Sequence, residues 1–389
     1  MLKVLHPITR LIVGGAQENT MLTADYHNRL LEYAGQYKVD VVCGPQTGPE
    51  GSLIDEVRQR GIDLTIMPEL VREVNPAKDI WAILKLRNMM REGNYDLVHT
   101  HSSKAGVLGR VAAKWAGIPT IVHTVHGWSY HDHLSPGRKK FYVALEKLGY
   151  RNGDAMIVVS PKDIDKGLAE GIGRREDYTV IRSGIELERF GNPQVPPSEI
   201  RDQLGIPADA LVIGSVTRLS EQKDPLSLID ALAKVHQKRP EVYFIVVGDG
   251  LLRPEVEDKI ANCGLQDQVV LTGLRRDVPE LMAAFDIFVL SSLWEGLPRV
   301  LPQAMATSLP IVCTKADGSA EAVEHGVNGF LVEPKRPDQV ADRLIQLVDS
   351  AELRRDFGAA GKAKVPMFGA KKMVADIDQL YKKLIQQKK

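Results

Sequence analysis

The chain has 389 residues, which is longer than one ordinary hydrophobic core fills, so the sequence predicts two domains. Its 50 Lys and Arg residues balance 50 Asp and Glu residues, which argues against a nucleic-acid-binding protein, because such proteins usually present a basic face. The three cysteines, Cys43, Cys263 and Cys313, are far apart in the sequence and predict neither a disulfide framework nor a zinc site.

The N-terminal residues, MLKVLHPITR, lead directly into a short apolar segment and contain no signal-peptide core. The sequence contains no apolar run of about 18 residues, the length that a membrane-spanning helix needs. Isolated cysteines also fit a reducing compartment. We therefore expect a cytoplasmic protein, which could still lie peripherally at the inner face of a membrane.

Short apolar runs alternate with amphipathic segments through the first part of the chain. Proteins with a doubly wound parallel sheet show this alternation of strand and helix patterns. Residues 1–187 are therefore predicted to form a first Rossmann-like α/β domain. Its expected strands are 3–6, 39–43, 63–67, 97–100, 120–124, 155–159 and 178–181.

Residues 188–207 are rich in proline and charged residues and are predicted to be a linker. A second alternation follows, so residues 208–370 are predicted to form a second Rossmann-like domain, and residues 371–389 read as one more amphipathic helix. Ligands bind at the carboxyl ends of the strands in such sheets, and two domains that face each other enclose a cleft. The expected strands of the second domain are 211–216, 243–247, 269–271, 287–290, 311–313 and 329–332.

Small and polar residues follow two strands of the first domain where their carboxyl ends should lie. Gly14 and Gly15 come after the first strand, and adjacent glycines let a backbone approach a ligand closely or take positive φ. His126 comes after the strand 120–124. A tight turn and a structural strand-end histidine are the alternative interpretations of these residues.

A further polar group ends the strand predicted at 97–100. His101, Ser102 and Lys104 are expected to be exposed, whereas His99 is expected to be structural. We expect His99 and His101 to face opposite sides of their strand, so that they would not share a metal ion. No Asp-x-Asp element is placed to hold a divalent ion, so the sequence predicts no metal and no other cofactor.

Residues 128–151 interleave basic side chains with aromatic ones. Such a segment can contact anionic lipid at a membrane surface. A core helix with solvated charges gives the same pattern, so both interpretations stay open.

The second domain offers cations and glycines after its strands. Arg218 and Lys223 lie on the loop after the strand 211–216, and two cations can neutralise a diphosphate as a metal ion does elsewhere. Gly248 follows the next strand and gives a close turn. Leu274 and Arg275 follow the strand 269–271.

The most informative stretch is VLSSLWEGLPRVLPQAMA, residues 289–306. Glu295 and Gly296 follow a buried strand, and a helix is predicted to start near Pro298, because proline is tolerated in a first turn. The free N–H groups and partial positive charge of that helix end suit a phosphate or a sugar hydroxyl. Gln303 comes eight positions after Glu295 (303 − 295), about two helical turns, and is expected to face the same way.

This stretch resembles the donor-site signature of glycosyltransferase family 4, in which a Glu is followed after seven residues by a second Glu. The Gly14-Gly15 loop, the His126-Gly127 position and the Arg218 and Lys223 pair resemble further parts of the family pattern, in the family's order. The resemblance implies a GT-B architecture, with two Rossmann-like domains facing across a cleft and helix 371–389 crossing back to the N-terminal domain. It also implies metal-independent, retaining transfer from a nucleotide-diphosphate sugar, a UDP- or GDP-sugar, to a hydroxyl acceptor that is often lipid-linked. Synthesis of a cell-surface polysaccharide or glycolipid is the expected setting, and peripheral membrane contact through 128–151 would fit such acceptors.

The resemblance also implies a role for each residue. Glu295 and His126 are expected to hold the donor sugar, and Arg218 and Lys223 to stabilise the departing diphosphate. The residues implied in donor binding are Gly14, Gly15, Gly248, Leu274, Arg275, Gly296, Leu297 and Gln303, and those implied in acceptor binding are His101, Ser102 and Lys104.

Gln303 departs from the family pattern, which has Glu there. Its amide oxygen can still accept hydrogen bonds from ribose hydroxyls, but it loses charge assistance of about 1 kcal/mol. A non-catalytic nucleotide-sugar-binding protein therefore stays open as an alternative. A nucleotide-sugar epimerase or hydrolase of the same architecture is the other, although no additional carboxylate cluster supports it.

Overall fold

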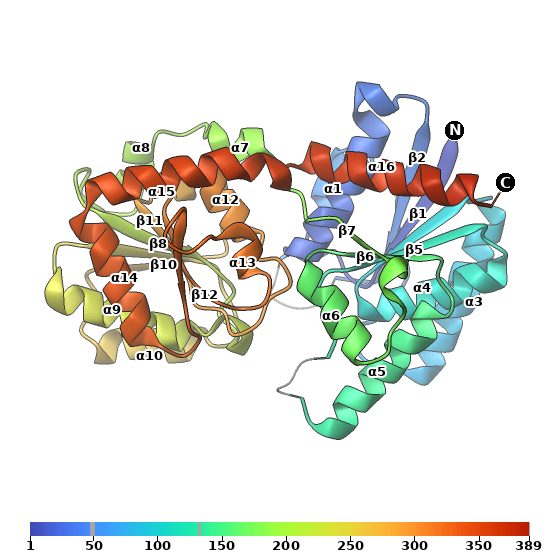
Figure 1. The fold of residues 1–389 in the computed structure, drawn as a ribbon, viewed down its shortest axis with the longest axis horizontal. Helices are drawn as coiled ribbons and strands as arrows, with labels where there is room; N and C mark the ends of the chain where they lie inside the picture. The colour runs from blue at the N-terminus through green and yellow to red at the C-terminus, as the bar shows by residue number, and fades with distance from the viewer. Residues whose placement is uncertain (47–50, 131–133, 389) are drawn as a thin grey trace. The chain divides into compact units, whose positions relative to one another are not determined.

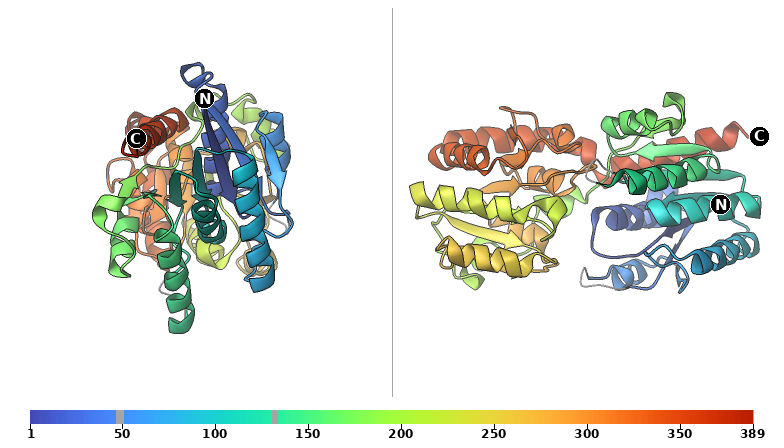
Figure 2. Two further views of the ribbon diagram at one scale, coloured as in Figure 1. Left: turned by 90° about the vertical axis from the view of Figure 1, so that its right-hand side faces the viewer. Right: turned by 90° about the horizontal axis from the view of Figure 1, so that it is seen from below.

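The computed structural model describes residues 1–46, 51–130 and 134–388. The chain forms two compact units: unit 1 comprises Met1–Gly184 and Ala370–Lys389, and unit 2 comprises Ile185–Gly369. Each unit contains one parallel sheet with helices on both faces (Figures 1 and 2). The predicted α/β class with two doubly wound sheets is confirmed.

The sheet of unit 1 has seven parallel strands in the order β3-β2-β1-β4-β5-β6-β7. Its central strands are β1 (Leu2–Ile8), β4 (Leu97–His101) and β5 (Thr120–Val125), and nearly all of their residues are buried, as expected of strands covered on both faces. The winding reverses between β1 and β4, and the loops after these strands lie where open sheets bind ligands. The remaining elements before residue 185 are β2 (Tyr37–Cys43), β3 (Leu64–Ile66), β6 (Ala155–Val158), β7 (Tyr178–Val180), α1 (Gly15–Arg29), η1 (Leu31–Tyr33), α2 (Ile54–Gln59), α3 (Pro76–Glu92), α4 (Ser103–Ala116), α5 (Pro136–Tyr150), α6 (Pro161–Ala169) and η2 (Arg175–Asp177).

The last helix, α16 (Ala370–Gln386), belongs to unit 1 and packs along α1 (Figure 1). Met373, Ile377 and Tyr381 on this helix are buried in the same hydrophobic core as residues of β1 and β2. The Tyr37 hydroxyl on β2 also donates to Asp378 Oδ1 at 2.6 Å. The helix therefore completes the core of unit 1.

The sheet of unit 2 has six parallel strands in the order β10-β9-β8-β11-β12-β13. Its winding reverses between β8 (Val212–Val216) and β11 (Ile287–Leu290), so the loops after these two strands flank the equivalent ligand-binding position. The other elements are β9 (Tyr243–Val247), β10 (Val269–Gly273), β12 (Ile311–Thr314), β13 (Gly329–Val332), α7 (Leu187–Gly191), α8 (Pro197–Gln203), η3 (Glu221–Lys223), α9 (Pro225–Lys238), α10 (Arg253–Asn262), α11 (Val278–Ala283), α12 (Val300–Ala306), α13 (Ser319–Ala322), α14 (Pro337–Asp349), α15 (Ala351–Lys364) and η4 (Val365–Phe368).

The prediction of a linker at 188–207 is wrong, because this segment belongs to unit 2. It forms most of α7 and all of α8, which pack on α11, and α7 also packs on α12. Arg201 on α8 donates to Ala284 O at 3.0 Å and pairs with Asp286 Oδ2 at 3.0 Å. The prolines that suggested an irregular linker are compatible with short helices, because proline is favoured in a helix first turn.

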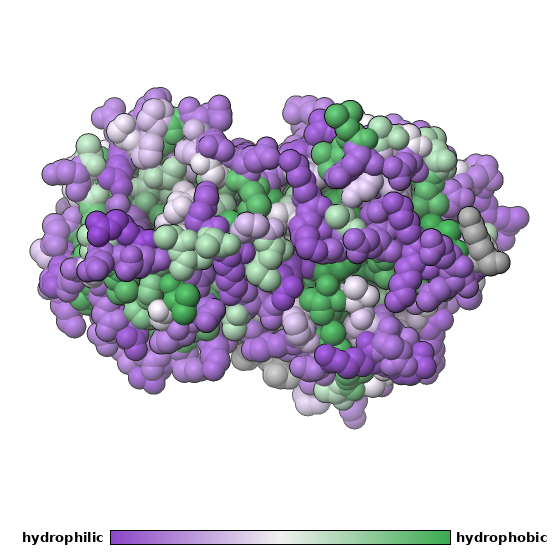
Figure 3. Space-filling model, turned by 45° about the horizontal axis from the view of Figure 1, so that its top comes forward, coloured by the Kyte–Doolittle hydropathy of each residue, from purple (hydrophilic) through white to green (hydrophobic). Residues whose placement is uncertain are grey.

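Among the described residues, no helix is both long enough and apolar enough to cross a bilayer. On the face drawn in Figure 3, hydrophobic side chains appear in separate patches among hydrophilic ones.

Candidate functional site

A charged cluster lies at the carboxyl edge of the sheet in unit 2. Glu295, in the loop between β11 and α12, forms an ion pair with Lys223, and Ser292 Oγ donates to the same carboxylate oxygen at 2.6 Å. The side chain of Glu295 is 8% exposed and that of Lys223 is 19% exposed. Water therefore screens this pair less than a surface ion pair. We call Glu295, Lys223 and Ser292 the Glu295 cluster.

Backbone and hydroxyl contacts hold the two loops of the Glu295 cluster together. Leu293 N donates to Gln222 O at 2.8 Å, and Gln222 Nε2 donates to Trp294 O at 2.9 Å. Ser291 Oγ donates to Lys223 O at 2.8 Å. The ion pair is thus built on a fixed frame between the β8 and β11 loops, which is the switch point of the sheet.

Arg218 is exposed on the loop that follows β8. Its guanidinium makes no hydrogen bond or ion pair with any described residue. The charge of Lys223 is already matched by Glu295, whereas Arg218 keeps all its donors for an anionic ligand.

Glycines allow backbone segments to approach closely at this edge of the sheet. Gly248 has φ +132°, and a Cβ there would lie 1.9 Å from Thr217 O. A Cβ on Gly318 would lie 1.7 Å from Gly296 O, so the loop after β12 packs directly on the loop of Glu295. Gly248 and Gly296, two of the residues predicted to bind the nucleotide-sugar donor, therefore lie at this edge of the sheet.

Leu274 and Arg275 follow β10, and Leu274 is 43% exposed. Arg275 Nε donates to Asp277 Oδ1 at 2.7 Å, and this hydrogen bond lowers the pKa of the Asp277 carboxyl. The same contact raises the pKa of Arg275. The charge of Arg275 is thus matched locally, which leaves the exposed Leu274 and the backbone as the groups that this loop offers.

The helix after Glu295 starts later than predicted. α12 begins at Val300, so Glu295 and Gln303 do not share a helix, and the argument that placed them on one helical face is wrong. Gln303 is 8% exposed, and its side-chain amide has no hydrogen-bond partner among the described residues. Leu297 is 7% exposed and joins the buried side chains of the loop.

In unit 1, Gly14 and Gly15 lie at the start of α1, a 15-residue helix. Gly15 is its first residue, and Gly14 has φ 178°, which is extended backbone that any residue adopts. Positive φ therefore does not explain Gly14. The start of a helix carries a partial positive charge, so this loop offers a favourable position for an anion.

The three residues predicted to be exposed and to bind the acceptor substrate are buried or already in contact with other side chains. His101 is fully buried, which contradicts its predicted exposure. Ser102 Oγ lies 2.8 Å from Thr9 Oγ1 and ties the end of β1 to the start of α4. Lys104 pairs with Asp79 Oδ1 at 2.7 Å, and its side chain is 15% exposed. These contacts indicate that Ser102 and Lys104 fix the loop instead of displaying free groups.

The expectation that His99 and His101 face opposite sides of β4 is wrong, because residues two apart lie on the same face of a strand. Their ring centroids are 4.3 Å apart, and the ring of His6 on β1 lies 4.9 Å from each. One nitrogen from each of these rings lies within 4.8 Å of the others, a spacing that could hold a metal ion. Sequence reasoning missed His6, although a histidine inside an apolar strand was the available signal.

Hydrogen bonds already use the nitrogens of two of these rings. His99 contacts Tyr381 Oη at 2.5 Å and Thr124 Oγ1 at 2.7 Å. His101 contacts His6 Nδ1 at 2.8 Å and His126 Nε2 at 3.0 Å. Burial lowers the pKa of His99 and His101 well below the usual range, so both rings are neutral. His126, at the end of β5, is thus anchored to the core of unit 1.

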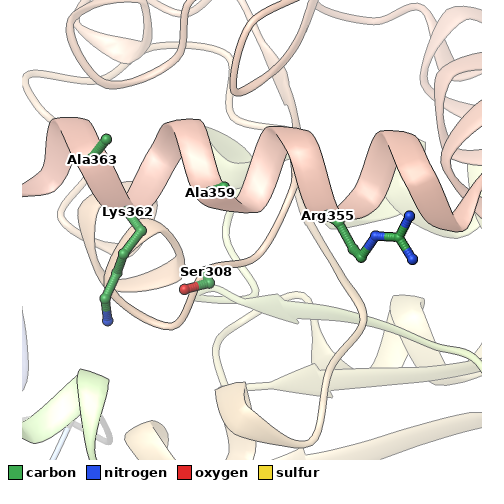
Figure 4. A pocket seen from close by; sticks show the side chains of 5 residues that line it. All are labelled: Ser308, Arg355, Ala359, Lys362 and Ala363. Carbon is green, nitrogen blue, oxygen red and sulfur yellow. The ribbon is translucent and has the colours of Figure 1, made fainter.

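Unit 2 also has an open hollow of about 650 Å³ along α15. Figure 4 shows Arg355 and Lys362 on either side of Ser308. Ser308 precedes β12, so this hollow lies at the amino edge of the sheet. It is therefore separate from the Glu295 cluster at the carboxyl edge.

Two family models match the chain: "Glycosyltransferase Family 4" over residues 27–189 and "Glycosyl transferases group 1" over residues 197–364. The chain is 30% identical over 350 residues, 89% of each protein, to the UDP-Gal:alpha-D-GlcNAc-diphosphoundecaprenol alpha-1,3-galactosyltransferase of Escherichia coli. It is 27% identical to the putative glycosyltransferase EpsD of Bacillus subtilis, over 76% of this chain and 79% of that one.

Solved structures show the same fold. HepE of Anabaena, in complex with UDP and glucose, has a TM-score of 0.83 and 27% identity, over 98% of this chain and all of that one. The lipopolysaccharide glycosyltransferase WaaG has a TM-score of 0.76 at 20% identity. With the Glu295 cluster at a switch point and family models matching both units, the chain belongs to the family 4 glycosyltransferases of the GT-B fold.

Proposed function

We propose that the protein transfers a hexose, with retention of anomeric configuration, from a UDP-hexose to a hydroxyl group of a lipid-linked saccharide. The observation that carries the proposal is the Glu295 cluster together with the unpartnered Arg218, at the edge where open sheets bind nucleotides. The UDP complex of HepE and the UDP-galactose in the name of the Escherichia coli relative support the choice of nucleotide. That relative's diphosphoundecaprenol acceptor supports a lipid-linked saccharide and a role in surface polysaccharide or glycolipid synthesis.

In the proposed reaction, the bond between sugar C1 and the diphosphate oxygen breaks while C1 bonds to the acceptor oxygen on the same face. The acceptor proton passes to the departing diphosphate oxygen, so the scheme needs no protein base. Arg218 and Lys223 offset the charge that develops on the diphosphate. Glu295, held by Lys223 and Ser292, accepts hydrogen bonds from the sugar hydroxyls, and His126 donates one to the sugar.

Gln303 has a place in this scheme as an acceptor for the ribose hydroxyls. Its amide has no partner in the part of the chain that the structure describes, so a ligand would not have to displace a hydrogen bond seen there. A neutral hydrogen-bond acceptor at this position weakens binding of the nucleotide sugar by about 1 kcal/mol relative to a carboxylate. The substitution is therefore compatible with turnover at a raised KM.

UDP at about 100 times its Kd is expected to stabilise the folded protein by about 2.7 kcal/mol and to raise its Tm. GDP and ADP should give smaller shifts, and EDTA should leave the UDP shift unchanged. Differential scanning fluorimetry with each nucleotide, with and without EDTA, measures this. A shift lost on chelation would contradict metal-independent binding, and equal shifts with all three nucleotides would contradict a UDP site.

Arg218→Ala removes the guanidinium proposed to contact the diphosphate. This variant should lose most of the Tm shift that UDP causes. Arg355→Ala removes a guanidinium from the hollow along α15, at the opposite edge of the same sheet, and should keep the full shift. The two variants separate a specific diphosphate contact from a general loss of positive charge in unit 2.

We also propose that α5 holds the protein at the cytoplasmic face of an anionic membrane. Phe141 and Leu148 are 47% and 44% exposed, and their seven-residue separation places them on one face of the helix. Arg138 and Lys140 are exposed on the same helix. Exposed apolar side chains next to cations are what an anionic lipid surface attracts.

A Phe141→Ser, Leu148→Ser double variant is expected to bind anionic vesicles at least about tenfold more weakly, because two buried apolar contacts are lost, roughly 1.4 kcal/mol or more. Co-sedimentation with phosphatidylglycerol-containing and pure phosphatidylcholine vesicles measures the loss. Trp81→Ser with Trp115→Ser is the matched control, since these side chains are 60% and 58% exposed on α3 and α4. Unchanged binding of the α5 variant, or equal loss in the control, would contradict this membrane contact.

A further inference from the structure

The loop that follows β12 holds the loop of Glu295 at two points, besides the close packing of Gly318. Beyond the last backbone pair of β11 and β12, the Thr314 hydroxyl donates to the carbonyl oxygen of Ser292 at 2.5 Å. Three residues further along the chain, Asp317 Oδ2 accepts from the backbone N–H of Glu295 at 3.3 Å. The two side chains thus contact the backbone on both sides of the turn that carries the Glu295 carboxylate.

The contact of Thr314 lies in the interior of unit 2. Thr314 is 2% exposed and Ser292 is fully buried. A buried carbonyl that loses its donor carries a desolvation cost, so the hydroxyl of Thr314 fixes the peptide of Ser292. The side chain of this same Ser292 donates to Glu295 Oε1 at 2.6 Å. Thr314 therefore acts on the carboxylate through one intermediate residue.

Asp317 has an unusual backbone conformation. Its φ is +35°, a value that residues other than glycine adopt infrequently, although Asp and Asn tolerate it better than most. Backbone strain of this kind persists where the surrounding structure holds it, and it is concentrated at functional sites. Here the strained residue is also the one whose carboxylate accepts from the N–H of Glu295.

The carboxylate of Glu295 is held from one side. The Lys223 ammonium and the Ser292 hydroxyl both contact Oε1, and a carboxylate oxygen accepts about two hydrogen bonds. Oε2 makes no hydrogen bond or ion pair with any residue that the structure describes. Oε2 is therefore the oxygen that can accept from a ligand, and its direction depends on the backbone of the loop.

We propose that Thr314 and Asp317 are positioning residues that clamp the Glu295 loop, so that Oε2 of Glu295 meets the hydroxyl groups of the donor sugar. Neither residue contacts the sugar in this scheme. Because a single oxygen makes the contact, a small shift of the loop is enough to lose it. The role toward the sugar rests on the proposed function, whereas the clamp itself does not.

Matched substitutions at Thr314 test the first contact. Thr314→Val keeps the shape of the side chain without the hydroxyl, and it should lower kcat/KM for a UDP-hexose at least about fivefold. The Tm shift caused by UDP, which has no sugar to contact, should stay that of the parent. Thr314→Ser keeps the hydroxyl and should stay within about twofold of the parent. A parent-like kcat/KM for Thr314→Val, or equal losses in both variants, would overturn the role of Thr314.

Substitutions at Asp317 separate activity from stability. Glycine takes a positive φ without strain, so Asp317→Gly should keep the Tm of the parent within a few degrees while kcat/KM falls about fivefold. Asp317→Asn keeps an oxygen acceptor and tolerates this φ, so it should retain most of the activity. If Asp317→Gly is as active as Asp317→Asn, Asp317 does not position Glu295.

Thr23→Val is the control, because the hydroxyl of this buried residue on α1 in unit 1 also donates to a backbone carbonyl, that of Asn19, at 2.8 Å. It should leave kcat/KM unchanged, whatever it does to Tm. Hydrogen–deuterium exchange of the full-length protein tests the clamp without turnover. Peptides that cover residues 291–297 should exchange faster in Thr314→Val than in the parent, Thr314→Ser or Thr23→Val. A parent that transfers no hexose would contradict the proposed function alone, whereas equal exchange in all four proteins would overturn the clamp.

Discussion

Replacing Lys223 with alanine is expected to lower kcat/KM for the nucleotide sugar at least about tenfold, or about 1.4 kcal/mol of transition-state stabilisation. The variant loses the cation proposed for the diphosphate. It also leaves Glu295, whose side chain is only 8% exposed, without its ionic partner. An uncompensated, shielded carboxylate disfavours a diphosphate, so both effects act in the same direction. Steady-state kinetics with UDP-hexoses measures the change.

Glu295→Ala is expected to reduce turnover by a similar factor. Because the two residues are in contact, the double variant should lose less than the sum of the single losses, with an interaction energy of about 0.5–3 kcal/mol. Lys259→Ala is the matched control in unit 2. It breaks the ion pair between Lys259 on α10 and Asp230 on α9, whose N–O distance is 2.7 Å. Near-normal rates for both site variants would refute the assignment of the Glu295 cluster.

Replacing Glu146 with alanine is expected to destabilise unit 1 by about 3–5 kcal/mol, because it leaves a buried charge unpaired. Arg110 on α4 is fully buried, and its Nη2 lies 3.4 Å from Glu146 Oε2 on α5. Burial lowers the pKa of Arg110, and Glu146 counteracts that effect. Glu146 also accepts from Ser103 Oγ at 2.5 Å and Ser129 Oγ at 3.2 Å, so it ties α4, α5 and the loop after β5 together.

Urea unfolding measures this change as a shift in midpoint with little change in slope. An Arg110→Met, Glu146→Leu double variant should recover much of the loss, because two apolar groups carry no unpaired charge. Lys38→Ala, which breaks the exposed Lys38–Asp63 pair of 3.0 Å, should cost less than about 1 kcal/mol. A loss for Glu146→Ala no larger than for Lys38→Ala would contradict the assigned role of the buried pair.

The strands could be predicted because a parallel sheet covered on both faces needs continuous apolar runs. The run 243–247 is β9 and the run 287–290 is β11, residue for residue. The Glu295 motif could be found for a related reason, since its residues follow a strand at a sheet edge that binds ligands. That motif and the order of the others were enough to identify the family.

Side-chain partners could not be predicted in the same way. Nothing local in the sequence shows that Lys104 meets Asp79 or that Ser102 meets Thr9, because each contact joins different elements. Ser292, a member of the Glu295 cluster, was missed for the same reason. The linker error has another cause: proline and charge mark irregular chain and short surface helices alike, and only the packing of α7 and α8 separates them.

The place of α16 bears on how the chain is made. Unit 2 is one uninterrupted stretch, Ile185–Gly369, whereas unit 1 takes its final core residues from the last helix. During synthesis, the ribosome therefore releases every segment of unit 2 before unit 1 can complete its hydrophobic core. Until Tyr381 arrives, the surface left by the missing helix stays open, so nascent chains and C-terminal truncations alike would be substrates for chaperones and proteases.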